Sequence, residues 1–161
     1  MKKLKILIVD DNPHFVNALR FMLMDYFDDR IESISTASDG QDCMMQLRNH
    51  VSDFVFMDIN MPGMNGIEAT RQATILYRNL IVIAVSFHSE MKYVVQMIEA
   101  GARSYIIKDE ICHESLEKAL AIEYTFWFIF LRINIVNVIL RQRVRLLFIQ
   151  YLIYFLKYAY F

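Results

Sequence analysis

Cysteine is scarce in this chain, which has only Cys43 and Cys112 among its 161 residues. Both lie inside helix-like patterns and lack the CxxC spacing of a metal or redox site, so we expect reduced thiols rather than a disulfide or metal ligands. A secretory signal is not recognisable at the start, where lysines flank a strand-like run. These features favour a cytoplasmic protein.

Acidic residues are absent after Glu123, and this divides the chain by charge. Residues 1–123 hold all 18 acidic residues and 12 of the 17 basic ones, a net charge of −6, whereas residues 124–161 carry +5. Phosphate contacts need a basic surface, so we expect residues 1–123 to make no nucleic acid contact. The length of the chain predicts one domain with a sizeable core. We assign that domain to residues 1–123 and treat residues 124–161 as a hydrophobic, basic tail.

The tail has no Gly, Pro, Asp, Glu, Ser or Met, and Ile, Leu, Phe and Tyr dominate it. Its first apolar run, Tyr124–Leu140, is at the short limit for a membrane span and contains Arg132 near its middle. The second run, Leu146–Leu156, is too short to span alone, and a basic segment at 141–145 separates the two. We therefore expect a helical tail without an assignment to a known effector domain.

Three interpretations of the tail stay open. It is an aberrant C-terminus, such as a translated frameshift in AT-rich DNA, or a membrane-associating helix pair with a basic loop on an anionic surface. Alternatively, it extends the preceding helix and packs on a partner or on a second copy of the chain. A helix-turn-helix is the least supported, because the tail lacks the glycine-containing turn and the polar recognition face of that motif.

Short apolar runs alternate with helix-like patterns through residues 1–123. We expect buried strands at Leu4–Val9, Ile31–Thr36, Phe54–Met57, Leu80–Val85 and Ser104–Ile107. Helical spacing follows them at about 13–27, 39–48, 67–77, 90–100 and 112–123, and in the fourth helix Ser89 is the expected N-cap and Gly101 the end. The weak alternation of the second strand places it near the sheet edge. Five βα units in succession predict an α/β fold, with a parallel sheet, right-handed crossovers and helices on both faces.

Polar residues follow four of these strands at their carboxyl ends, and they are Asp10, Asp11, Asp58, Ser86 and Lys108. Such strand ends form the ligand-binding edge of an open α/β sheet. Three carboxylates at one edge would repel one another, and their oxygens suit a hard divalent ion such as Mg²⁺. A lysine and a serine beside that ion could bind the oxygens of a phosphoryl group. The cluster is therefore suited to phosphoryl transfer onto a carboxylate nucleophile.

From Leu4 to about Glu123 these residues resemble the receiver domain of bacterial two-component response regulators. The matching segments are Val9–Asn12, Met57–Gly66, Ser86, Gly101–Ala102 and Tyr105–Lys108. The resemblance implies a flavodoxin-like, doubly wound sheet with strand order 2-1-3-4-5. It also implies a phospho-acceptor rather than a conventional enzyme, with a sensor histidine kinase as the phosphodonor partner.

The resemblance further implies a role for each matching residue. Asp58 is the expected phospho-acceptor, and Lys108 pairs with the phosphoryl group. Mg²⁺ is the implied cofactor, with ligands from Asp10, Asp11, Asp58 and the main-chain carbonyl of Asn60. Ser86 and Tyr105 are the expected switch residues. They act on an output surface formed by the fourth helix, fifth strand and fifth helix, through which a homodimer is possible.

The chain also departs from the family pattern. Asp109 replaces the proline that commonly follows the lysine, as in the NarL/FixJ-type subclass whose members carry a LuxR-type helix-turn-helix, so we expect part of a transcription regulator. Phe87 is larger than the usual residue and could narrow access to Asp58. The alternative function is therefore a non-phosphorylated receiver-like interaction module, or a truncated regulator with an aberrant or membrane-associating tail.

Structural interpretations also stay open for individual residues. Asp10 could cap the first helix, Asp58 could be a turn or capping residue, and Ser86 could be a capping serine. Tyr105 could be a static, half-buried core residue. His88 lies beside the predicted site and is interpreted as a loop histidine rather than a ligand.

Overall fold

The computed structural model describes residues 3–121, so the predictions about the tail at 124–161 lie outside the described residues. Strands and helices alternate along the described chain. The strands are β1 (Leu4–Val9), β2 (Ile31–Ala37), β3 (Phe54–Met57), β4 (Ile81–Ser86) and β5 (Ser104–Ile107). The helices are α1 (Pro13–Phe27), α2 (Gly40–Asn49), α3 (Gly66–Leu76), α4 (Met91–Glu99) and α5 (His113–Leu120), with a short 3₁₀ helix η1 (Lys108–Glu110) after β5.

The five strands form one parallel sheet in the order β2-β1-β3-β4-β5, which confirms the strand order implied by the resemblance and the edge position of β2. The pairing register brings the ends of neighbouring strands level. Val9 pairs with Met57, and the Asp58 N–H donates to the Val9 carbonyl at 2.8 Å. The residues that leave β1 and β3 therefore emerge next to each other.

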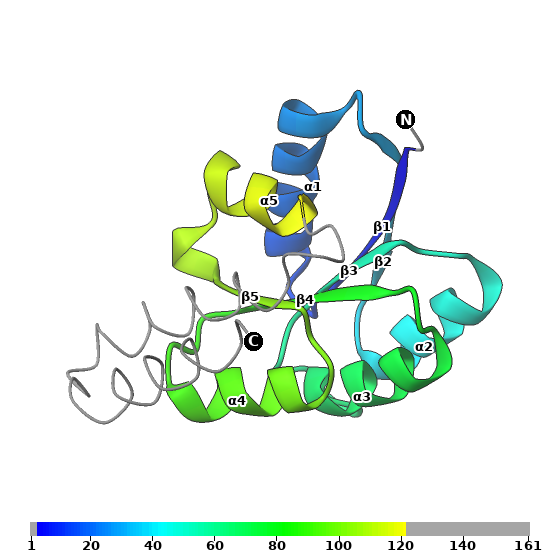
Figure 1. The fold of residues 1–161 in the computed structure, drawn as a ribbon, viewed down its shortest axis with the longest axis vertical. Coiled ribbons are helices and arrows are strands. Elements are labelled where there is room, and N and C mark those ends of the chain that lie inside the picture. Colours follow the sequence, from blue (N-terminus) through cyan, green and yellow to red (C-terminus); the bar gives the residue numbers. More distant parts are fainter. Residues whose placement is uncertain (1–2, 122–161) are drawn as a thin grey trace, which may run out of the picture.

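Helices cover both faces of the sheet, with α1 and α5 on one face and α2, α3 and α4 on the other (Figure 1). Successive strand residues point to opposite faces. Ile6 and Ile8 accordingly pack in the core under α1 and α5, while Leu7 and Val9 pack in the core under the other three helices. Because both faces are covered, the central strands are apolar at almost every position, and this explains the short apolar runs in the sequence.

Most element boundaries agree with the sequence predictions to within a residue or two, but Ser89 is not the N-cap of α4. The cap is Glu90, whose backbone is still extended, so the first helical residue is Met91. Gly101 ends this helix as predicted, with a φ of +107° and its N–H donating to the Ile98 carbonyl at 2.9 Å. Among residues 3–121, no helix is both long and apolar enough to cross a membrane.

Candidate functional site

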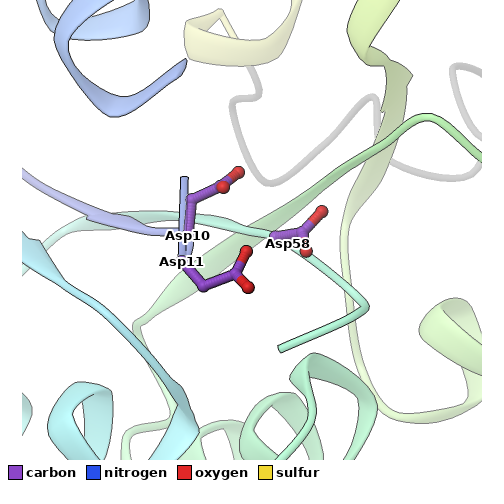
Figure 2. A group of neighbouring side chains, drawn as sticks. All are labelled: Asp10, Asp11 and Asp58. Carbon is purple, nitrogen blue, oxygen red and sulfur yellow. The ribbon is translucent and has the colours of Figure 1, made fainter. Parts of the chain in front are cut away.

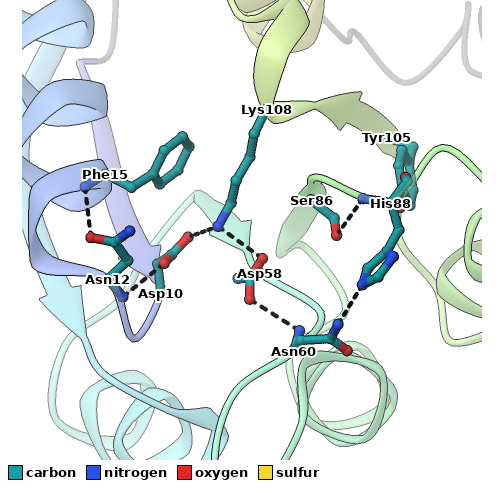
Figure 3. A network of polar contacts seen from close by, with 9 residues as sticks. All are labelled: Asp10, Asn12, Phe15, Asp58, Asn60, Ser86, His88, Tyr105 and Lys108. Carbon is teal, nitrogen blue, oxygen red and sulfur yellow. Dashed lines mark hydrogen bonds and ion pairs between the residues drawn. The ribbon is translucent and has the colours of Figure 1, made fainter.

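Asp58 lies at the carboxyl end of β3, where its side chain is buried and reached by two hydrogen-bond donors (Figure 3). Its Oδ1 is 3.0 Å from the Lys108 Nζ, and its Oδ2 accepts a hydrogen bond from the Asn60 N–H at 3.0 Å. Burial raises the pKa of the Asp58 carboxyl above its ordinary value, and the nearby Lys108 opposes that rise. Asp58 is therefore a desolvated carboxylate held in one orientation by its neighbours.

Asp10 and Asp11 bring two more carboxyl groups to Asp58 (Figure 2). One oxygen from each of the three residues lies within 4.8 Å of the other two, with Asp10 and Asp58 buried and Asp11 exposed. Asp10 does not cap α1. Its Oδ1 accepts from the Asn12 N–H at 2.9 Å, and Asn12 caps the helix by accepting from the His14 and Phe15 N–H groups.

The donor set fits a hard divalent cation such as Mg²⁺, because it consists of closely spaced carboxylate oxygens. Asp10 Oδ2 is buried, and its partner is the Lys108 ammonium, whose Nζ lies 2.6 Å away. Three carboxylates thus face one ammonium in this cluster, and a divalent cation would balance their remaining negative charge.

Lys108 closes the cluster from the end of β5. Its side chain is only 5% exposed, and its Nζ contacts both Asp10 Oδ2 and Asp58 Oδ1. The same Nζ lies 4.3 Å from the ring centroid of Phe15 and 5.1 Å from that of Phe87. A buried ammonium therefore faces two carboxylates and two aromatic rings, and it offsets the negative charge that the carboxylates would otherwise concentrate.

A comparison with known protein families gives a match over most of the chain. The family described as the response regulator receiver domain matches residues 6–121. The chain belongs to this family. Receiver domains bind Mg²⁺ at an acidic site and interact with histidine kinases, and this receiver domain has an acidic cluster of Asp10, Asp11 and Asp58.

Curated relatives of this receiver domain include transcription regulators. It is 31% identical over 107 residues to the transcriptional regulatory protein DegU of Brevibacillus brevis, covering 66% of this chain and 44% of the relative. It is also 31% identical over 105 residues to the response regulator UvrY of Escherichia coli, covering 65% and 47%. The chain thus spans about half the length of the curated relatives it matches.

Solved structures share the fold. A chain of the CheX-CheY-BeF3-Mg+2 complex from Borrelia burgdorferi is 26% identical, with a TM-score of 0.64 and coverage of 74% of this chain and 87% of that one. A CheY-like receiver domain protein from Methanospirillum hungatei has a TM-score of 0.65 at 24% identity, with coverage of 74% and 91%. These similarities agree with the flavodoxin-like fold implied by the resemblance to receiver domains.

Ser86 and Tyr105 both bind the backbone of His88 in this receiver domain. The His88 N–H donates to Ser86 Oγ at 3.2 Å, and the Tyr105 hydroxyl donates to the His88 carbonyl at 2.7 Å (Figure 3). Ser86 is buried at the end of β4. Burial raises the pKa of the Tyr105 hydroxyl to about 12, so this group stays protonated and remains a donor. Ser86 and Tyr105 thus bind the backbone N–H and the backbone carbonyl of the same loop residue, His88.

The His88 side chain links two loops at the edge of the site. Its Nε2 forms a short contact with the Asn60 side-chain nitrogen, and its Nδ1 lies 3.4 Å from a Glu90 carboxylate oxygen. Its ring also packs on Tyr93 with the centroids 4.3 Å apart. His88 therefore joins the loop after β3 to the loop after β4. The sequence predicted only that His88 lies in a loop and did not predict these contacts.

Sequence patterns miss two residues of the site. Helical spacing groups Phe15 with the apolar residues of the first helix, but its ring faces Lys108 instead of only filling the core (Figure 3). Asn12 has no predicted role of its own, although it donates to Asp10 and caps α1. Their position within four residues after Asp11 is the signal that could have found them, because the first turn of α1 follows the end of β1 at the sheet edge.

Proposed function

We propose that this receiver domain accepts a phosphoryl group on Asp58 from a sensor histidine kinase. The observation that carries the proposal is a buried carboxylate 3.0 Å from a buried lysine ammonium, with two further carboxylates whose oxygens lie within 4.8 Å. On this proposal Asp10, Asp11, Asp58 and the main-chain carbonyl of Asn60 hold Mg²⁺. The ion would supply positive charge beside the transferred group.

The reaction needs only one nucleophile from the chain. An Asp58 oxygen attacks phosphorus, and the bond from phosphorus to the donor's leaving atom breaks with its electron pair going to the leaving group. Lys108 is already placed to pair with phosphoryl oxygens, because its ammonium touches the same carboxylate. Later attack by water returns phosphate and the free Asp58 carboxylate. The chain thus assists its own phosphorylation and dephosphorylation and is not a conventional turnover enzyme.

We further propose that Ser86 and Tyr105 transmit the modification. On this proposal the Ser86 hydroxyl reorients to donate to a phosphoryl oxygen and gives up the hydrogen bond that it accepts from the His88 N–H. That change loosens a residue whose carbonyl Tyr105 also holds. The result would be a population shift in the loop after β4 and in the surface of α4, β5 and α5. Hydrogen exchange of the loop amides should increase on phosphorylation in the wild type, and much less in Ser86→Ala.

The direct test is incubation of the full chain with Mg²⁺ and a small-molecule phosphodonor, followed by intact-mass measurement. The wild type should gain one phosphoryl group, and Asp58→Asn should not. Asp39→Asn is the matched control: Asp39 is not one of the clustered carboxylates, its side chain caps α2, and asparagine caps equally well, so this variant should be modified like the wild type.

The alternative function is a non-phosphorylated interaction module. One observation favours it: Lys108 already pairs with both buried carboxylates, so its ammonium has partners without a phosphoryl group. An unmodified wild type under conditions that phosphorylate another receiver domain would favour this alternative. Modification that persists in Asp58→Asn would contradict the assignment of the acceptor.

For the whole protein we propose a cytoplasmic transcription regulator that forms a homodimer through α4, β5 and α5. Its named relatives support regulation of transcription, and β5 is the last strand of the sheet with Val95 exposed on the adjoining α4. Residues 1–123 would contact no nucleic acid. Sedimentation with and without phosphodonor tests the pairing, and a Val95→Lys variant should weaken it.

The division between a receiver domain at 1–123 and a tail at 124–161 also stays a prediction, as do membrane contact by the tail and an aberrant origin for it. Translation of the coding DNA beyond codon 123 in all frames tests the aberrant origin. A helix-turn-helix encoded in another frame would support it. Vesicle flotation of the full chain with anionic lipids tests the membrane interpretation.

A further inference from the structure

The Lys108 ammonium makes two kinds of contact. Two are with the carboxylates of Asp10 and Asp58, and two are with aromatic rings from elements far apart in the sequence, Phe15 in the first turn of α1 and Phe87 directly after β4. Both ring centroids lie within the range of a cation–π attraction, which is about 6 Å. The carboxylate contacts belong to the proposed phosphoryl-transfer chemistry, whereas the ring contacts do not.

We propose that Phe15 and Phe87 are positioning residues that hold the Lys108 ammonium by their ring faces while phosphoryl transfer occurs. This inference rests on the proposed function of Asp58. It assigns a role to two side chains that have no polar atom and cannot themselves bind a metal ion or a phosphoryl oxygen.

The need for such a hold follows from the carboxylates. In this structure they position Lys108, but the same two carboxylates belong to the cluster that suits a divalent cation. When Asp10 and Asp58 bind a cation, the positive charge of that cation weakens their electrostatic attraction for the Lys108 ammonium. The ring faces are unaffected by that exchange, so they are the contacts that keep the ammonium directed at Asp58.

The two rings are held in different ways. Phe15 is partly buried and packs against the core beneath α1 and α5, which fixes its position. Phe87 is 60% exposed, so its ring is not placed there by core burial. The contact between its ring and the Lys108 ammonium explains why this exposed phenyl ring lies next to a buried charge. The sequence also suggested that Phe87 narrows access to Asp58. That interpretation predicts the opposite result, because a smaller residue at position 87 would then speed phosphorylation.

The test compares Phe15→Leu, Phe87→Leu and Phe87→Tyr with wild type, and Phe21→Leu is the control because Phe21 is a 71% exposed phenylalanine of α1. Leucine keeps apolar bulk but lacks the negative ring face, and tyrosine restores that face. The first measurement is the rate constant of phosphorylation by phosphoramidate with Mg²⁺. The second, on unphosphorylated protein, is the NMR shift of the Lys108 ε-methylene protons, which the ring current of a stacked phenyl displaces.

We expect each leucine variant at 15 or 87 to be phosphorylated about three- to tenfold more slowly, with the Lys108 ring-current shift reduced. Phe87→Tyr should recover most of the rate, and Phe21→Leu should match wild type. Leucine variants that react at the wild-type rate or faster would overturn this inference while leaving Asp58 as acceptor. A wild type that takes no phosphoryl group overturns the proposed function and this role with it. Phe87 is exposed, so its substitutions test the idea even where Phe15→Leu fails to fold.

Discussion

Gly66 provides the sharpest test of how the fold positions Asp58. It is the first residue of α3 and lies against the backbone of the residue that β3 delivers to the site. A Cβ at Gly66 would stand 1.8 Å from the Asp58 carbonyl oxygen and 3.1 Å from the Ile59 Cα. Both atoms belong to the backbone and cannot rotate away. Gly66→Ala therefore forces the start of α3 and the end of β3 apart by roughly 1 Å.

The size of the effect follows from the contacts that this shift disturbs. Overpacking of this kind costs about 1–3 kcal/mol. The hydrogen bond from the Gly66 N–H to the Ile59 carbonyl, 2.9 Å long, is also stretched, which adds about 0.5–1.5 kcal/mol. The better helix propensity of alanine returns at most about 1 kcal/mol. We expect a net loss of about 2–3 kcal/mol in the free energy of unfolding.

The same shift moves the Asp58 carboxylate relative to Lys108, so we expect phosphorylation to slow by about 100-fold, as is common for a 1 Å misplacement. Urea unfolding and the phosphorylation rate constant measure the two effects. Gly63→Ala is the matched control. Gly63 has a φ of +70°, and no atom lies within 4 Å of the place that a Cβ would take there, so only the backbone strain of about 1–2 kcal/mol is expected. The reasoning is refuted if Gly66→Ala costs no more stability than Gly63→Ala and reacts at the wild-type rate.

Three further predictions concern the charges of the site. Because burial raises the pKa of Asp58 in the folded state, its ionised form destabilises the fold. Asp58→Asn should thus be more stable than wild type at pH 7 in urea unfolding, with the gain fading as the pH falls toward the ordinary carboxyl pKa of 3.8. Lys108→Met leaves two buried carboxylates without their ammonium, so it should lose about 3–5 kcal/mol at pH 7. Part of this loss should be recovered at pH 5, where the raised pKa of Asp58 makes its protonation easier, and equal losses at both pH values would contradict the ion pairing. Mg²⁺ at a hundredfold excess over its Kd should stabilise the fold by about 2.7 kcal/mol in thermal unfolding. Asp11→Asn should need more Mg²⁺ for the same shift in melting temperature, and a melting temperature independent of Mg²⁺ would refute the metal assignment.

Several features of the molecule could be predicted from sequence alone because they depend on local patterns. Apolar runs such as Phe54–Met57 mark strands covered on both faces, and helical spacing between them predicts the alternating order. That order requires a parallel sheet, and a parallel sheet gathers the carboxyl ends of its strands at one edge. The closeness of Asp10, Asp58 and Lys108 follows from this chain of reasoning, whereas the strand order came only from the resemblance to receiver domains.

Only the tertiary structure decided how the side chains of the site meet. Whether Lys108 contacts one carboxylate or two depends on the register of β1, β3 and β5, which no local pattern specifies. Phe15 has the spacing of an ordinary core residue, and its contact with Lys108 arises because the start of α1 and the end of β5 lie at the same edge of the sheet. Sequence patterns determine which face of an element is buried, since that depends on neighbours along the chain. The pairing of an ammonium with particular rings and carboxylates depends on distances between elements, which are set only when the whole sheet and its helices pack.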